Sequence, residues 1–428
     1  MIINEKIMFK IHYIKTIPFS IQLVLISVLV CFSFNLKAQS LEELKIIAAE
    51  NNLALKAQYK TFEAQLEQVT QAKSWQDPNL SFGYFISPIE TRVGPQIAKF
   101  SLTQMLPWFG TFKAKGDIAA YQAEAEFENF QDKKLKLFLK VAEKYYDLAA
   151  LRQITKIETK QLQILNDLKS IVESNYENNQ ANLVDIYRVE LEIDKQLNAI
   201  KVLKDQDQAL ETQLNQLMNR QLKTPITIAN STQVLEQNKT VVADSVSTNH
   251  PRLEAIRHLQ TSNEVEIELS KKQALPQFGI GLDYAIIQDR NVTNADAGQD
   301  AFMPMLSVSL PIFGKKIKSR KKVAALRGES LQYQFENEKT LINSEIQITK
   351  YKQDELLNVL DLYNKQLLRL KDILKLSEIA LSNASMAIEE VLRLEDERLL
   401  YQKQRFKTLA ELQKTKAKIN YLTSNSEL

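Results

Sequence analysis

The sequence predicts a mainly α-helical protein with a small β part, built from one unit that is used twice. Two copies of a short motif point to the duplication, Leu106-Pro107-Trp108-Phe109-Gly110 and Leu310-Pro311-Ile312-Phe313-Gly314, offset by 204 residues. Upstream, Pro78 and Gly83 precede the first copy as Pro276 and Gly281 precede the second, both offset by 198 residues. Internal repeats of this kind indicate one supersecondary unit used more than once.

The positions of glycine and proline predict where the long helices lie. All nine glycines fall in two windows, residues 83–116 and 279–328. Residues 117–224 and 329–428, runs of 108 and 100, contain neither glycine nor proline. Because these two residues are the main breakers of regular structure, both runs are expected to be helical.

Each repeat is predicted to begin with a helix. Ser40-Leu41-Glu42-Glu43 has the pattern of a capping box, in which the first and last side chains cap each other's backbone. It opens a helix expected to reach about Lys73, with Leu41, Leu44, Ile47 and Ala48 at helical spacing. The counterpart in the second repeat begins near Pro251, a residue favoured in the first helical turn, and reaches about Ala274.

A strand pair follows in each repeat. In the first, Leu80 to Phe85 and Phe100 to Leu106 alternate with period two, separated by a loop expected around Pro88, Gly94 and Pro95. In the second, Phe278 to Asp283 and Leu306 to Leu310 alternate across a polar loop, residues 291–300. The sequence therefore predicts four strands in all.

Each strand pair leads into a long helical hairpin with arms of about 50–60 residues, or roughly 75–90 Å at 1.5 Å per residue. The first turn is expected at Asn178, Asn179 and Gln180, and the second at Ser382, Asn383 and Ala384. The returning arm of the first hairpin has a coiled-coil seam with Ile186, Ile193, Ile200 and Leu214 in one register and Val189, Leu203, Leu210 and Leu217 in the other, interrupted by Asp207.

These elements divide the chain into four segments. Residues 1–38 have a basic start, an apolar stretch and a possible cleavage site, as an export signal does. Residues 39–222 form the first repeat, 223–249 a mixed polar linker or belt, and 250–428 the second repeat.

Charge and composition exclude several function classes. Without residues 1–38 the chain has 51 basic and 51 acidic residues, which argues against a nucleic-acid partner. The single cysteine, Cys31, lies in the apolar stretch, so the remainder has no thiol chemistry. No apolar run of 18 residues follows residue 38, so any crossing of a membrane must use strands.

No catalytic, cofactor-binding or metal site is apparent. His250 and His258 have no partner at ligand spacing and are expected to be solvated helix residues. Met105, Met303 and Met305 lie beside strands, where thioethers could bind a soft metal; irregular packing is the preferred interpretation. Acidic residues are spread among Lys and Arg along the helices, as on solvated faces.

Four strands are too few to close a membrane barrel, for which about eight are needed. Because open sheet edges are not tolerated in lipid, several chains would have to share one barrel. Trp75 and Trp108 flank the first strand pair, where an interfacial aromatic belt would lie.

The duplicated unit, Pro276-Gln277-Phe278 after a helix, the Leu-Pro-x-Phe-Gly motif before one, and two matched hairpins together resemble the TolC-type outer-membrane efflux ducts, with some likeness to CusC-type members. The resemblance spans the chain after residue 38. It implies a homotrimer with a twelve-stranded barrel in outer-membrane lipid and an α-helical periplasmic tunnel. It also implies docking to a periplasmic adaptor protein and an inner-membrane efflux pump. Two departures stand out: family turns usually carry glycine where Asn179 and Ala384 stand, and the lipid-modified cysteine of many relatives is missing.

The resemblance assigns roles to particular positions. The hairpin turns, at the residues named above, would be the tips that dock an adaptor. Pro78, Pro107, Gly110, Pro276, Pro311 and Gly314 would join barrel to tunnel. An offset of 205 residues places Asp185 onto Glu390, just past each tip, where six carboxylates per trimer could form a cation-attracting gate. The competing interpretation is that an acidic residue in a first turn only complements the helix dipole.

Two other functions remain open at this point. A periplasmic coiled-coil scaffold without a pore would use the strand pairs as small caps, and would be released without detergent. An exported enzyme is disfavoured because no catalytic group is visible.

Overall fold

A computed structural model describes residues 39–228, 230–236, 249–289 and 298–424. The export signal, about half of the linker and most of the polar loop of the second repeat therefore lie outside the described residues. The elements of the first repeat are α2 (Leu41–Asn51), α3 (Leu53–Lys73), β1 (Asn79–Thr91), β2 (Gly94–Leu106), α4 (Thr111–Glu177) and α5 (Leu183–Leu217). The short α6 (Ser231–Glu236) precedes those of the second, α7 (Pro251–Lys272), β3 (Gln277–Ile287), β4 (Ala301–Ser309), α8 (Gly314–Ser382) and α9 (Ile388–Leu422).

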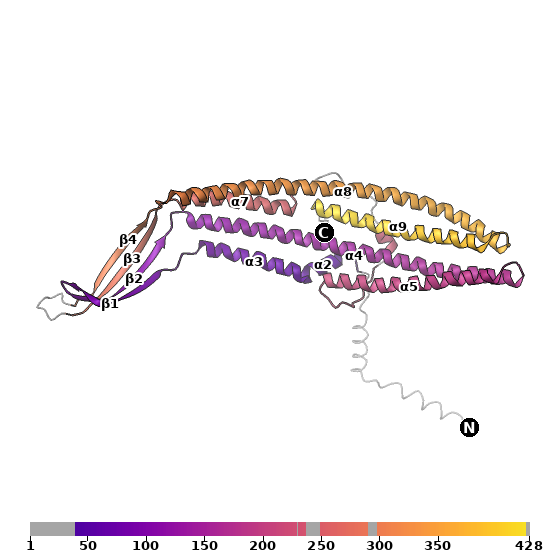
Figure 1. The fold of residues 1–428 in the computed structure, drawn as a ribbon, viewed down its shortest axis with the longest axis horizontal. Coiled ribbons are helices and arrows are strands. Elements are labelled where there is room, and N and C mark those ends of the chain that lie inside the picture. The colour runs from indigo at the N-terminus through magenta and orange to yellow at the C-terminus, as the bar shows by residue number, and fades with distance from the viewer. Residues whose placement is uncertain (1–38, 229, 237–248, 290–297, 425–428) are drawn as a thin grey trace, which may run out of the picture.

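The molecule is a long, gently curved helical body with a small sheet at one end and two hairpin tips at the other (Figure 1). The predicted fold class is confirmed, because the succession of helix, strand pair and long hairpin occurs twice. None of the helices in the described residues has both the length and the apolar character of a membrane span.

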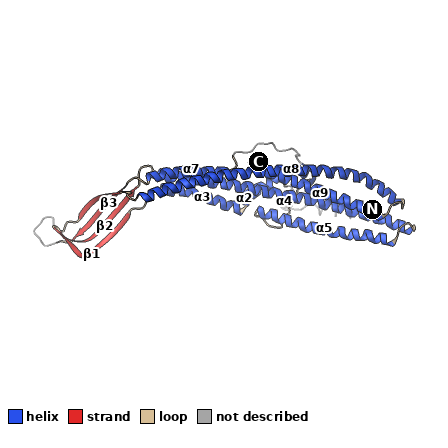
Figure 2. Ribbon diagram, turned by 45° about the horizontal axis from the view of Figure 1, so that its top comes forward, coloured by secondary structure: helices blue, strands red, loops and turns tan. Residues whose placement is uncertain are grey.

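The two hairpins have unequal arms, so the prediction of arms of 50–60 residues is wrong. The outgoing helices α4 and α8 have 67 and 69 residues, or about 100 Å each, whereas α5 and α9 have 35 each. The returning helices end half-way along the body (Figure 2). Over the remaining half, α2 and α3 pack against α4, and α7 packs against α8. Along the body, α4 therefore packs first between α3 and α7 and then between α5 and α9, with α8 outermost.

Apolar clusters form at the joints, where a returning helix ends and the first helix of the same repeat takes its place. Leu214 and Met218, at the end of α5, pack with Leu44 of α2 against Leu148 of α4. In the second repeat, Tyr421 and Leu422 of α9 pack with Leu253 of α7 against Ile342 and Ile346 of α8. Both repeats thus use the same joint, which explains why a long helix can be covered by two shorter ones.

The first predicted helix is in fact two helices. The capping box at Ser40 is present, with the Glu43 amide donating to Ser40 Oγ at 3.2 Å and the Ser40 amide donating to the Glu43 carboxylate at 3.1 Å. The helix breaks at Asn52, whose Oδ1 caps α3 and whose Nδ2 donates to the Leu217 carbonyl of α5 at 2.8 Å. Asparagine competes with the helix by such bonds, so the break ties α2 and α3 to the end of α5.

The four strands form one antiparallel sheet in the order β1-β2-β3-β4. The loop expected around Pro88, Gly94 and Pro95 is wrong, because both strands continue through it and only residues 92–93 separate them. A register shift between Tyr84 and Ile89 accommodates Pro88 in β1. Proline is tolerated there because β1 is an edge strand and a bulge removes the need for its amide.

Candidate functional site

The two faces of the sheet differ in polarity. One face carries an aromatic row across all four strands, in which the ring centroids of Phe82 and Phe100 are 4.8 Å apart, those of Phe100 and Tyr284 6.5 Å, and those of Tyr284 and Phe302 4.8 Å. The rows between the aromatic row and the helices are also mostly apolar. They are, in order, Leu80, Leu102, Leu282 and Pro304; then Gln104, Ile280 and Leu306; then Leu106, Phe278 and Val308. Phe82 is 60% exposed and Phe302 67%, so no described part of the chain covers this face.

The opposite face of the sheet is polar and has small side chains. It carries Ser81, Ser101, Thr103 and Ser307, the glycines of β1 and β3, and an ion pair between Lys99 and Asp283. Met105, Met303 and Met305 also lie on this face, next to Gly279, Gly281 and Asp283. Both edges of the sheet, β1 and β4, lack a neighbouring strand among the described residues.

The residues predicted to join barrel and tunnel lie where strands meet helices. Gly110 has φ +76° at the start of α4, and a Cβ there would lie 2.6 Å from Lys272 Nζ, so this position needs glycine. Gly314, its counterpart in the motif, is the first residue of α8 and has open space around it and no positive φ. The motif is therefore repeated in sequence, but only its first copy has the steric requirement.

Trp75 and Trp108 lie at the same end of the sheet, because β1 and β2 form a hairpin whose outer ends meet at the helices. Trp75 is 63% exposed and its ring centroid lies 5.2 Å from that of Phe112. Trp108 is half-buried and stacks on Phe278 at 6.1 Å. The two tryptophans therefore mark one boundary of the sheet, not two.

The two hairpin turns have the same backbone geometry at the predicted offset of 205 residues. Asn179 has φ +55° and Ala384 φ +53°. In the first turn the Gln180 amide donates to the Asn175 carbonyl at 2.7 Å, and in the second the Ser385 amide donates to the Ala380 carbonyl at 2.8 Å. This is the helix ending in which glycine is usual, and the two non-glycine residues adopt it.

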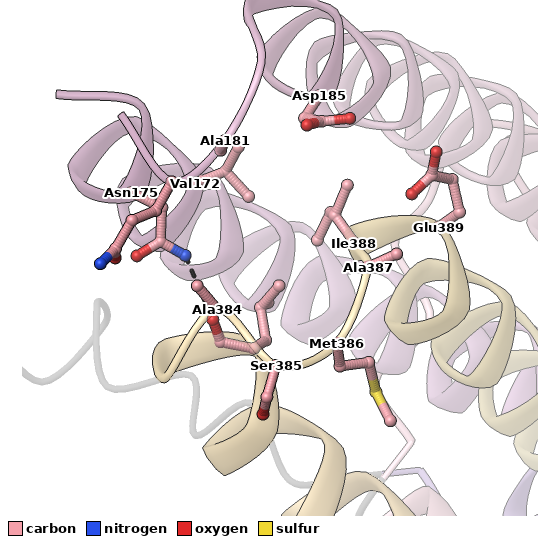
Figure 3. A pocket seen from close by; sticks show the side chains of 12 residues that line it. Val172, Asn175, Ala181, Asp185, Ala384, Ser385, Met386, Ala387, Ile388 and Glu389 are labelled. Carbon is pink, nitrogen blue, oxygen red and sulfur yellow. Dashed lines mark hydrogen bonds between the residues drawn. The ribbon is translucent and has the colours of Figure 1, made fainter. Parts of the chain in front are cut away.

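A cavity of about 320 Å³ lies between the two tips (Figure 3). Asn175, Ala181 and Asp185 line it from the first hairpin, and Ala384, Ile388 and Glu389 from the second. Its floor is an apolar cluster shared by the two hairpins, which includes Val172, Val189, Leu381 and Val391. Asn175 is buried and donates its Nδ2 to the Leu381 carbonyl at 3.1 Å, so a polar bond also ties the tips together.

Each carboxylate of the predicted gate is paired with an arginine one turn further along its helix. Asp185 accepts from the Asn182 amide at 3.0 Å and from Arg188 Nη1 at 3.1 Å. Glu390 accepts from Arg393 Nη2 at 2.6 Å and Nε at 3.0 Å, and these hydrogen bonds lower the pKa of its carboxyl. Both carboxylates stand in the first turn of a returning helix, where the helix dipole also favours them.

The arginines and Glu389 were missed at the sequence level. Arg188 forms a second ion pair with Glu389, which connects the first hairpin to the second. Arg188 and Arg393 are themselves 205 residues apart, so the repeat contains the carboxylate and its arginine together. That shared offset was the signal that could have found them.

Buried carboxylates lie further along the tips' helices, contrary to the expectation that acidic residues occupy solvated faces. Glu158 of α4 is 1% exposed, accepts from Gln196 of α5 and pairs with Lys403 of α9. Glu395 is also 1% exposed, and accepts from Gln161 at 3.1 Å and pairs with Arg398. Burial raises the pKa of Glu395, against the opposing effect of Arg398. These groups fix α4 to both of its neighbours.

The expectation that both histidines are solvated is wrong for His250. Its side chain is fully buried against the Tyr421 ring, with centroids 5.3 Å apart, and its Nδ1 accepts from the Arg252 amide at 3.2 Å as the cap of α7. Burial lowers the pKa of His250 to about 4. His258 is partly exposed, with Nδ1 2.9 Å from Glu124. Within the residues that the structure describes, no three His, Cys, Asp or Glu side chains are grouped so that they could hold a metal ion.

Comparison with known proteins agrees with the geometry. Residues 47–220 match the sequence model of the family described as outer membrane efflux protein. The chain is 22% identical over 272 residues to the outer membrane efflux protein BepC of Brucella suis, and this match covers 62% of the chain and 59% of BepC. The chain thus spans about three-fifths of the curated relative that it matches.

Solved structures show the same fold. The outer membrane protein VceC of Vibrio cholerae aligns with a TM-score of 0.70 and 14% identity over 90% of this chain and 95% of that one. The CusC channel aligns with a TM-score of 0.71 and 15% identity over 90% and 92%. The family resemblance predicted from the sequence is confirmed. The near-equal scores do not single out CusC-type members.

Proposed function

We propose that this chain, whose residues 47–220 belong to the outer membrane efflux protein family, is the outer-membrane exit duct of an export system that spans the cell envelope. The observation that carries the proposal is the four-stranded sheet, which has one exposed apolar face, one polar face and two unpaired edges. An apolar face of this extent is not left in water by a monomeric protein. In a membrane it would face lipid, and the polar face would line a pore.

The open edges require further copies of the chain. Three copies joined from β4 to β1 would give twelve strands and remove every edge, as a membrane demands. The outermost helix supports such contacts, because α8 leaves Tyr333, Tyr351 and Leu376 70–75% exposed. The helical bodies of three copies would then enclose a tunnel of about 100 Å on the side of the membrane to which they project.

The two tips would form the far end of this tunnel. Their shared cavity and their ion pairs are suited to a closure that can open, because the pair that links the hairpins, Arg188 with Glu389, is exposed to solvent. Asp185 and Glu390 would contribute six carboxylates to a ring in the trimer, each moderated by its arginine. An adaptor protein docked on Asn178 to Gln180 and Ser382 to Ala384, together with an inner-membrane pump, would complete the system.

The protein would act as a passive duct and not as an enzyme, since its family consists of efflux channels. It would need no cofactor, and energy would come from the pump. The alternative of a soluble scaffold is disfavoured by the exposed aromatic row, which a scaffold has no reason to keep.

Fractionation and native mass spectrometry test the proposal together. The full chain expressed in a Gram-negative host should be extracted from outer membranes only by detergent, and should then have the mass of three copies. Planar bilayers should show conductance with this material. Release of the protein without detergent, or a stable single chain that gives no conductance, would refute the duct.

A further inference from the structure

Cationic side chains gather where the sheet meets the helical body. Within residues 70–78, 107–117, 268–276 and 310–322 there are eleven lysines and arginines but three carboxylates, a net charge of +8. We name the eleven the junction collar: Lys73, Lys113, Lys115, Lys271, Lys272, Lys315, Lys316, Lys318, Arg320, Lys321 and Lys322. The three carboxylates are Asp77, Asp117 and Glu268.

The four stretches come together in space. Helices α3 and α7 end, and α4 and α8 begin, at the end of the body next to the sheet (Figures 1 and 2). Lys272 Nζ lies 3.4 Å from the Gly110 carbonyl, and Arg320 Nη1 donates to Gln273 Oε1 at 2.6 Å. The Lys73 side chain lies against Gly116, where an added Cβ would be 2.2 Å from its Cε. The collar is therefore one surface contributed by four helices.

The densest part of the collar has no partner within the described chain. Lys315, Lys316, Lys318, Lys321 and Lys322 are all exposed, and none of their side-chain ammonium groups forms an ion pair or hydrogen bond with a described residue. Two of them occupy the first turn of α8, which contains no acidic residue. A cation there opposes the helix dipole, so the fold itself gains nothing from this placement. An anion outside the chain would account for it.

An apolar belt borders the collar on the side of the sheet. Ile312 is 76% exposed, Phe313 77% and Phe109 85%, and each lies within a few residues of a collar lysine. Trp75 adds an exposed indole at the same level. Apolar and aromatic groups followed by lysines match the order of acyl chains and phosphates that a protein meets on leaving a lipid leaflet.

We propose that the junction collar binds the phosphate groups of anionic phospholipids in the leaflet that faces the helical body. The proposal rests on the proposed function, in which the sheet spans that membrane. Each lysine near an anionic lipid surface strengthens attraction several-fold, and the effect falls off within a Debye length. The collar would thus fix the depth of the sheet and hold the body perpendicular to the membrane.

The two tryptophans of the chain, Trp75 and Trp108, both lie at this boundary and report on it directly. The purified full-length protein is reconstituted in mixtures of phosphatidylcholine and phosphatidylglycerol in which one of the two lipids carries brominated acyl chains. Tryptophan quenching then gives the relative affinity for the two lipids. We expect a preference of about tenfold for phosphatidylglycerol at low salt, lost at high salt.

The test variant is K315Q/K318Q/K322Q, whose three lysines share one face of α8 by their spacing of three and four residues. Its preference should fall below about threefold. The control, K339Q/K371Q/K375Q, removes three exposed lysines of the same helix far from the sheet and should keep the wild-type preference.

Each outcome has one meaning. An unchanged preference in the test variant overturns the lipid-binding collar. Competition by millimolar inorganic phosphate would also overturn it, because the collar would then be a site for free anions. Dissociation of the test variant into single chains would overturn it as well, because the lysines would then form a contact between subunits. If neither brominated lipid quenches tryptophan, the sheet does not enter the membrane and the proposed function itself fails.

Discussion

Ala384 holds a left-handed backbone conformation at the tip of the second hairpin, with φ +53°. An L-residue other than glycine or asparagine loses about 1 kcal/mol in this region because its Cβ crowds the following carbonyl. A384G should therefore stabilise the protein by about 1 kcal/mol, measured as a rise in the thermal midpoint in detergent. The control A325G changes an exposed alanine in the interior of α8 and should lower the midpoint, since glycine weakens a helix interior by about 1 kcal/mol.

His250 makes stability depend on pH. Its pKa is about 4 in the folded protein, below the ordinary value of 6.5, so the unfolded chain binds more protons between these limits. Stability is then complete above pH 6.5 and is lost progressively as the pH falls to about 4, by roughly 3 kcal/mol for a shift of this size. The cost of acidification arises because the buried ring must be charged.

H250N separates this titration from the helix cap. Asparagine can accept from the Arg252 amide as an N-cap but does not titrate, so the variant should lose most of the fall in midpoint between pH 6.5 and 4.5 that wild type shows. The matched control H258N changes a partly exposed histidine and should keep the wild-type slope. Equal slopes in wild type and H250N would contradict this account.

At the scale of elements, sequence periodicity identified the helices and strands but not where they end. Glycine and proline located both long helical runs, yet Asn52 breaks the first helix because its side chain finds a carbonyl of α5, a partner 165 residues away. Pro88 suggested a loop, but the edge position of β1 makes proline harmless. The unequal arms follow from how α2 and α7 meet the returning helices, which no local pattern encodes.

For the candidate site too, the sequence predicted positions along the chain but not the contacts that the residues make. The repeat offset of 205 residues placed both turns and both carboxylates correctly on their elements. It did not reveal that Asp185 and Glu390 are neutralised by Arg188 and Arg393, because an arginine three residues along a helix is common on any solvated face. The buried Glu158 and Glu395 had no sequence signal, since their partners come from other helices.

Asp207 interrupts the coiled-coil seam of α5 for a reason that the structure supplies. Its carboxylate accepts from Arg152 of α4, with Nε to Oδ1 at 2.9 Å, and Arg152 also donates to Glu211 and to the Ile226 carbonyl at 2.6 Å. D207L would complete the apolar register but leave a half-buried guanidinium with fewer partners, so we expect a loss of about 1–2 kcal/mol. The single variant R152L leaves the Asp207 and Glu211 carboxylates without their guanidinium. The double variant R152L/D207L should therefore lose less stability than the sum of R152L and D207L, because each single change leaves one partner of the same ion pair behind. A double variant less stable than the sum of the single changes would refute the coupling.

At the scale of the whole molecule, each copy of the duplicated unit has an apolar joint at the middle of the body and a hairpin tip at its far end. The joints at the middle of the body are buried and apolar, whereas the tips combine an apolar floor with exposed ion pairs and a cavity. Stability is therefore expected to be greatest at the middle and least at the tips. Such a gradient would allow the tips of a tunnel to move apart while the helices of its middle part stay folded and packed.

The tips give the last prediction, on ion conduction by the assembled duct. If the first-turn carboxylates face the opening, the field of six of them should attract cations, and D185N/E390Q should lower cation selectivity roughly twofold or more in single-channel recordings. R188Q/R393Q should raise cation selectivity, because it removes the arginines that neutralise the same carboxylates. It should also increase the time spent in a high-conductance state, since Arg188 no longer links the hairpins through Glu389. D194N/D372N, which removes one carboxylate from each hairpin 14 and 10 residues from its tip, serves as the control. Indistinguishable selectivity in all three variants would assign Asp185 and Glu390 to helix capping alone.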